Sequence, residues 1–125
     1  MSHKNQKFSF AGRIKSFKYA FEGLWYFVKN DHNGRLHLVA AVLAIGISWY
    51  LKIAAMEWVA ILSVITLVIA AEIFNSSIEK LADVVSTEYH PKIKVVKDLA
   101  AAGVVLMAFL AIVVGAIVFL PKLFC

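Results

Sequence analysis

The segment AEIFNSSIEKLAD, residues 71–83, places polar side chains directly after an apolar run. Residues 58–71 contain no charge, and four polar positions then follow: Glu72, Asn75, Glu79 and Asp83. Their spacing of three, four and four residues lines one face of a helix. A carboxylate inside a membrane is destabilising by about 2.5 kcal/mol or more near the middle of a span, so Glu72 is a candidate functional residue.

The two glutamates are expected at different depths of the membrane. If a spanning helix starts at Trp58, a rise of about 1.5 Å per residue places Glu72 roughly 9 Å inside the far boundary of a core about 30 Å thick. Glu79, about two turns further on, then reaches that boundary. A partly desolvated carboxylate is a suitable proton acceptor, and a surface carboxylate can bind Mg²⁺. The structural alternatives are a solvated Asp83 and a Glu79 that pairs with a lysine.

The loop that follows supplies complementary groups. It carries Glu88, Tyr89 and His90, and the next apolar run begins beside Lys97 and Asp98. Lysines are disfavoured at a helix start by the helix dipole, so they indicate a bound polyanion there; the alternative is the positive charge typical of cytoplasmic loops. A base, a metal-binding acid and cations are the groups that phosphoryl transfer to a lipid alcohol requires.

The elements that position these groups are predicted from composition. The chain has 125 residues, 62% of them hydrophobic, which is more than a soluble domain of this size can bury. A spanning helix needs about 20 apolar residues. The sequence therefore predicts transmembrane helices over 36–56, 58–85 and 92–121, with cytoplasmic extensions, in a single domain over 1–125.

An amphipathic helix is predicted over residues 8–30. Large apolar residues recur there at steps of three and four: Phe10, Ile14, Phe17, Phe21, Leu24 and Val28. Basic residues occupy much of the remaining surface, which suits a helix lying in the membrane interface or packing on the bundle. The expected fold class is an all-α membrane protein with one surface helix and three spanning helices.

Positive charge predicts the orientation. Eleven of the thirteen Lys and Arg residues lie before residue 36 or in the segment 80–98. These segments, and the N-terminus, are therefore expected in the cytoplasm. The net charge of +5 is explained by this topology rather than by nucleic acid binding. The single cysteine, Cys125, allows no internal disulfide.

Two other functions fit parts of the pattern. A small proton-coupled transporter could use Glu72 to exchange protons, although it would not need the cluster of His90, Lys97 and Asp98. A non-catalytic membrane adaptor would not bind ATP. No Gly-x4-Gly-Lys phosphate loop and no soluble protein kinase signature occurs in the sequence.

The motif EIFNSSIEKLAD, followed by EYHP and VKDLAAAG, resembles the bacterial integral-membrane diacylglycerol kinase and undecaprenol kinase family. RIKSFKYAFEGL in the surface helix and HNGRLH before the first span extend the resemblance over nearly the whole chain. The resemblance implies a homotrimer in the bacterial inner membrane, with active sites shared between subunits. It also implies Mg²⁺ and ATP as requirements for phosphorylation of a lipid hydroxyl, that of diacylglycerol or undecaprenol.

The resemblance also implies roles for individual residues. Glu72 would be the catalytic base, and Asp31 and Glu79 would be the metal ligands. The positions matched to ATP binding are Tyr19, Asp31, Asn75, Glu79, Glu88, Tyr89, His90, Lys97 and Asp98. Those matched to substrate binding are Arg13 and Glu72. Ala101 is a further candidate for substrate binding because of its position, one turn into the third span and facing the lysine region.

Three positions depart from the family pattern. Asp31 stands where the family usually has Glu, so its reach to a metal is one methylene shorter. Ser77 replaces a small apolar residue and is expected to hydrogen-bond within its own helix. Trp58, within MEW, is more like the polyprenol branch than like the diacylglycerol-specific members.

Overall fold

A computed structural model describes residues 8–124 of the chain, and these residues are almost entirely helical. The helices are α1 (Phe10–Asn30), α2 (His32–Leu51), α3 (Ala55–Val85) and α4 (Pro91–Leu123). Three of them, α2, α3 and α4, are long and apolar enough to cross a membrane. The predicted all-α class, with one surface helix and three spanning helices, is confirmed. Cys125 lies outside the described residues.

Helix α1 and Asp31 form one compact unit, and the chain from His32 onward forms a second unit. The Ser9 hydroxyl caps α1 by accepting a hydrogen bond from the Gly12 N–H at 3.0 Å. Asp31 ends the helix in an extended conformation, and its N–H donates to the Phe27 carbonyl at 3.0 Å. The connection to α2 is therefore the single residue Asp31.

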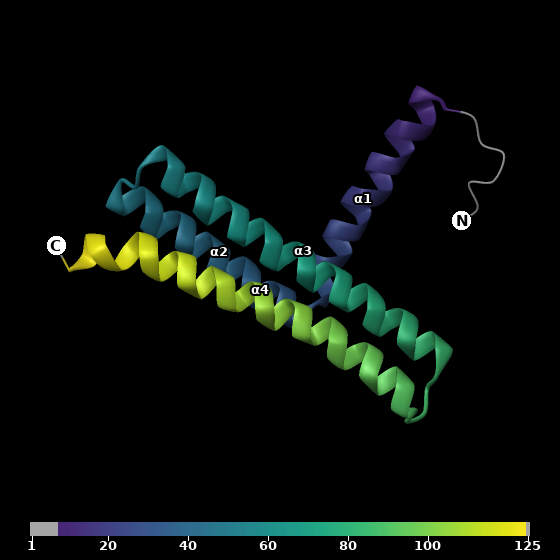
Figure 1. The fold of residues 1–125 in the computed structure, drawn as a ribbon. Coiled ribbons are helices and arrows are strands. Elements are labelled where there is room, and N and C mark those ends of the chain that lie inside the picture. Colours follow the sequence, from purple (N-terminus) through teal and green to yellow (C-terminus); the bar gives the residue numbers. More distant parts are fainter. Residues whose placement is uncertain (1–7, 125) are drawn as a thin grey trace. The chain divides into compact units, whose positions relative to one another are not determined.

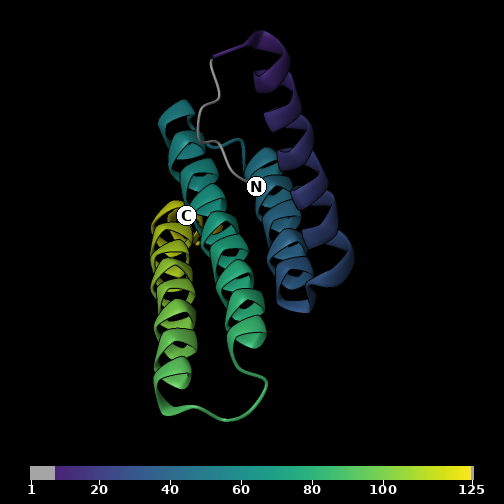
Figure 2. The ribbon, with the colours of Figure 1, turned by 90° about the vertical axis from the view of Figure 1, so that its right-hand side faces the viewer.

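The second unit is a bundle in which α2, α3 and α4 run side by side (Figures 1 and 2). Helix α3 packs against both α2 and α4, and its contact with α4 is the more extensive of the two. The α2–α3 turn and the C-terminal end of α4 lie at one end of the bundle, whereas the α3–α4 loop lies at the other (Figure 1).

The α2–α3 turn comprises residues 52–54, so α2 ends before residue 56, the end that the sequence predicted for the first span. Helix α2 ends at Leu51, and Lys52 adopts the left-handed conformation with φ 53°. Helix α3 then starts at Ala55, because the Glu57 carboxylate accepts a hydrogen bond from the Ala54 N–H at 2.9 Å. The same carboxylate pairs with Lys122 of α4 at 3.0 Å, which joins the two helices at this end.

Helices α3 and α4 have 31 and 33 residues, respectively. A spanning helix needs only about 20 residues, so each has roughly ten residues beyond the length that a bilayer core requires. Both lysine–aspartate pairs described below lie at the end of the bundle that holds the α3–α4 loop. The parts of α3 and α4 next to their connecting loop thus form a polar region beside the apolar part of the bundle.

Candidate active site at the polar end of the bundle

The packed face of α3 carries the central polar residues. Its buried members are Ile61, Val64, Val68, Glu72, Asn75 and Ala82. Glu72 is 3% exposed and Asn75 is 7% exposed, so both lie as deep as their apolar neighbours. The three- and four-residue spacing that builds the helix contact therefore also directs the Glu72 carboxylate into the bundle.

His37 of α2 lies opposite Glu72. Its Nε2 atom is 3.9 Å from Oε2 of Glu72, which is within ion-pair range but too long for a direct hydrogen bond. The Glu72 side chain is 4% exposed and that of His37 is 26% exposed. The imidazole is therefore the more accessible partner of a buried carboxylate.

Asn75 follows Glu72 by one turn on the same buried face. Its side-chain oxygen, Oδ1, has no hydrogen-bond partner among the described residues. A buried amide oxygen without a partner is destabilising by about 1–3 kcal/mol, and such groups often mark a place where a ligand or water binds.

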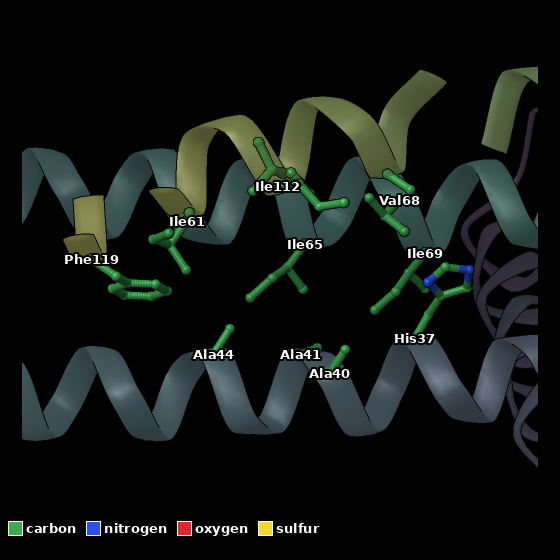
Figure 3. Close-up of a pocket in the computed structure, with 14 residues that line it drawn as sticks. His37, Ala40, Ala41, Ala44, Ile61, Ile65, Val68, Ile69, Ile112 and Phe119 are labelled. Atoms are coloured by element: carbon green, nitrogen blue, oxygen red, sulfur yellow. The ribbon is translucent and has the colours of Figure 1, made fainter. Parts of the chain in front are cut away.

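A cavity of about 270 Å³ lies between α2, α3 and α4. His37 lies at one end of it and Phe119 at the other (Figure 3). Alanines from α2, branched side chains from α3 and small residues of α4 line the rest, including Ala44, Ile65 and Gly115. Except for His37, the lining is apolar, so the cavity suits a hydrocarbon chain rather than a polar molecule.

Two ion pairs occupy the loop end of α3 and α4. Lys97 lies 2.6 Å from Asp83 across the two helices, and Lys94 lies 2.6 Å from Asp98 along α4. Glu79 is exposed on α3, and its carboxylate attracts the Lys97 ammonium group electrostatically. Two lysines and three carboxylates therefore gather at this end, as a site for a nucleotide and its metal would require.

The α3–α4 loop exposes the remaining polar candidates. Glu88, Tyr89 and His90 are all exposed, and the Ser86 hydroxyl donates to the Glu88 carbonyl at 2.9 Å. His90 caps α4, since its Nδ1 accepts a hydrogen bond from the Lys92 N–H at 3.1 Å. Pro91 is the first residue of α4, where its lack of an N–H costs nothing.

The other predicted residues are distributed as follows. Arg13 and Tyr19 are exposed on α1, and the Arg13 guanidinium lies 5.1 Å from the centre of the Phe8 ring. Asp31 is half-buried directly after α1, and Ala101 is exposed on α4. Within residues 8–124, no group of three or more His, Cys, Asp or Glu side chains is arranged to hold a metal ion. Asp31 and Glu79 belong to separate units.

Sequence reasoning missed His37 as a member of the site. The only signal was its position, since it is one of two basic residues in the apolar run 36–56. A lone histidine in such a run does not identify its partner. Its proximity to Glu72, which is 35 positions later in the chain, depends on how α2 and α3 pack.

The fold and the site define a helical multi-pass membrane protein with a buried carboxylate and a polar cluster at one end of its bundle. Residues 18–119 match the family model of prokaryotic diacylglycerol kinase, and the chain belongs to that family. It is a lipid kinase. The resemblance noted in the sequence is thereby confirmed.

Two relatives illustrate the range of the family. The chain is 31% identical to the undecaprenol kinase of Bacillus subtilis over 121 residues, which cover 97% of this chain and 96% of the relative. It is 32% identical to the diacylglycerol kinase of Escherichia coli K12 over 109 residues, which cover 87% of this chain and 89% of that protein.

Proposed function

We propose that this lipid kinase transfers the γ-phosphoryl group of ATP, in the presence of Mg²⁺, to the hydroxyl group of diacylglycerol or undecaprenol. The observation that carries the proposal is the position of Glu72. Its side chain is 4% exposed, faces the bundle and lies close to one end of an apolar cavity. A lipid alcohol with its chain in the cavity would present its hydroxyl group to a base.

Glu72 would act as the general base. Removal of the hydroxyl proton by a positioned base contributes about 10²- to 10⁴-fold to the rate. Arg13 would contact the lipid near its hydroxyl group, as the family resemblance implies, and Ala101 would contact it from the third span.

Asp31 and Glu79 would hold Mg²⁺. Carboxylate oxygens are the ligands that this ion prefers, and it commonly binds one or two protein carboxylates together with substrate phosphates. A bound Mg²⁺ would neutralise charge on the β- and γ-phosphates. A two-carboxylate set fits this chemistry, and the exposure of Glu79 leaves its oxygens accessible to a nucleotide-bound ion.

The nucleotide would bind at the loop end of α3 and α4. Lys97 would contact the phosphates, and Asn75 would orient either Glu72 or a phosphate. The side-chain amide nitrogen of Asn75 would make either contact, because a carboxylate and a phosphate both accept hydrogen bonds and only the amide NH2 group can donate them. Tyr19, Glu88, Tyr89, His90 and Asp98 complete the ATP site in this proposal.

We further propose a homotrimer in the bacterial inner membrane, with the N-terminus in the cytoplasm and active sites shared between subunits. Two inactive variants, Asp31→Asn and Glu72→Gln, offer a direct test. If each active site takes these two residues from different subunits, mixing and reassembling the two variants creates some sites in which both residues are intact. The mixture should then recover part of the activity. Mixtures as inactive as either variant alone would contradict sharing of these residues.

The proposed reaction is tested with purified protein in mixed micelles that contain radiolabelled ATP, Mg²⁺ and either diacylglycerol or undecaprenol. We expect label in one of the two lipids, and none when Mg²⁺ is removed with EDTA. Absence of label from both lipids would refute the proposed substrates, and undiminished labelling in EDTA would refute the metal requirement.

A further inference from the structure

We propose that His37 holds the hydroxyl group of the lipid substrate against Glu72. The inference rests on the proposed function, because it adds a second contact to the atom that Glu72 is proposed to deprotonate. Its basis is the arrangement of three features: the His37 imidazole, the buried Glu72 carboxylate and the apolar cavity that begins at His37 (Figure 3).

The distance between the two side chains fits a shared ligand. His37 Nε2 and Glu72 Oε2 are 3.9 Å apart. An oxygen atom placed about 2.8 Å from each of them, at normal hydrogen-bond length, completes a triangle with a favourable angle near 90° at that oxygen. One hydroxyl group can therefore accept a hydrogen bond from His37 and donate one to Glu72 at the same time.

The cavity determines which hydroxyl group could occupy this position. Its lining is apolar except for His37. The part of the substrate that lies beside Ala40 and Ala41 must therefore be hydrocarbon. By comparison with a 150 Å³ protein cavity that holds benzene, the volume would admit roughly ten carbon atoms. The ligand class is a long-chain alcohol with its chain in the cavity and its hydroxyl group at the His37 end.

In the reaction, His37 neither gains nor loses a proton. The substrate oxygen forms a bond to the γ-phosphorus of ATP, and the bond from that phosphorus to ADP breaks with its electron pair leaving on ADP. The hydroxyl proton passes to Glu72. The hydrogen bond from the Nε2–H group of His37 restricts rotation of the substrate hydroxyl group about its C–O bond. One lone pair of the attacking oxygen is thereby directed toward phosphorus.

Two substitutions of His37 separate hydrogen bonding from packing. His37→Phe keeps the ring and removes the donor, whereas His37→Gln keeps an N–H donor at about the same reach. We expect His37→Phe to lower kcat/KM for the lipid by about 10- to 100-fold, with the KM for ATP unchanged, and His37→Gln to recover most of that loss. Thr66→Val serves as the control, because it removes a hydroxyl of α3 that lies outside the cavity and is exposed.

Lipid binding without ATP tests the same contact independently of turnover. The melting temperature of the protein in detergent micelles is measured with the lipid alcohol, diacylglycerol or undecaprenol. It is measured again with the acetate ester of the same lipid, which lacks the hydroxyl proton. The unmodified protein should be stabilised more by the alcohol, and His37→Phe should lose that difference.

The proposal is overturned if the unmodified protein does not distinguish alcohol from ester, or if His37→Phe retains both the difference and its kcat/KM. It is also overturned if His37→Gln is as impaired as His37→Phe, since packing alone then explains the position. Failure of the proposed function is a separate result: neither lipid would be labelled, although the alcohol could still stabilise the protein through His37.

Discussion

Lys97 of α4 donates a hydrogen bond to Asp83 of α3 at 2.6 Å, so the lysine proposed to contact ATP is already paired with an acid. Lys97→Met should raise the KM for ATP about tenfold or more, because a cation on the phosphates is lost. Asp83→Asn should leave this KM unchanged or lower it, because it frees the lysine. Steady-state kinetics with varied ATP distinguish the two. Equal changes in both variants would indicate a structural pair without a role in nucleotide binding.

Glu72→Gln should lower kcat by about 10²- to 10⁴-fold, because the amide has nearly the same shape as the acid but cannot accept the proton. ATP binding, measured by equilibrium titration with a fluorescent ATP analogue, should change little. The matched control is Glu22→Gln, an acid exposed on α1. Retained turnover in Glu72→Gln would remove this residue from the proton transfer step.

Glu79→Gln should raise the Mg²⁺ concentration needed for half-maximal activity by about tenfold or more, because an amide is a weaker ligand for a hard cation than a carboxylate. Asp31→Glu restores the acid that the family usually has at this position, and we expect it to keep or improve the Mg²⁺ dependence. The measurement is a metal titration at fixed ATP. A normal titration curve for Glu79→Gln would contradict its assignment as a ligand.

Ala44→Ile adds three carbon atoms to a residue that lines the cavity. If the lipid chain lies there, the variant should raise the KM for the lipid and leave the KM for ATP unchanged. Ala55→Ile is the control, because Ala55 is exposed at the start of α3 and does not line the cavity. Equal lipid kinetics in both variants would show that the chain binds elsewhere.

Lys52→Gly should raise the free energy of unfolding by about 0.5–1 kcal/mol. Lys52 has a φ of 53°, a conformation that glycine adopts without the steric cost of a Cβ atom. Reversible unfolding in mixed micelles measures the change. Activity should remain, since Lys52 lies at the opposite end of the bundle from the lysine–aspartate pairs. A loss of stability would mean that the lysine side chain contributes more than its backbone conformation costs.

The Glu57 carboxylate has two partners, the Ala54 N–H at 2.9 Å and Lys122 at 3.0 Å. Glu57→Gln keeps an oxygen for the helix cap but removes the ion pair, whereas Glu57→Ala removes both. We expect the melting temperature to fall in the order unmodified, Gln, Ala, because capping and pairing act on the same helix end. If Glu57→Gln and Glu57→Ala lower the melting temperature equally, the ion pair accounts for the stabilisation by Glu57.

Much of the architecture could be predicted from the chain alone, because solvent preference is a local property. A run of about 20 apolar residues needs a bilayer whatever its neighbours are, and the three spanning helices were identified on that basis. The helix ends were less predictable. Helix α2 begins at His32 and ends at Leu51, whereas the sequence suggested 36–56, because polar residues at a helix end are tolerated once caps and turn geometry satisfy the backbone.

The sequence by itself determined that Glu72 and Asn75 share one side of a helix, since the helical repeat fixes that relation. Only the tertiary structure decided that this side is buried, that the Asn75 oxygen is left without a partner among the described residues, and that His37 lies 3.9 Å from Glu72. Residues on one helix are related by its regular geometry. Residues on different helices meet only through the packing of complete side-chain surfaces, which no local pattern in the chain specifies.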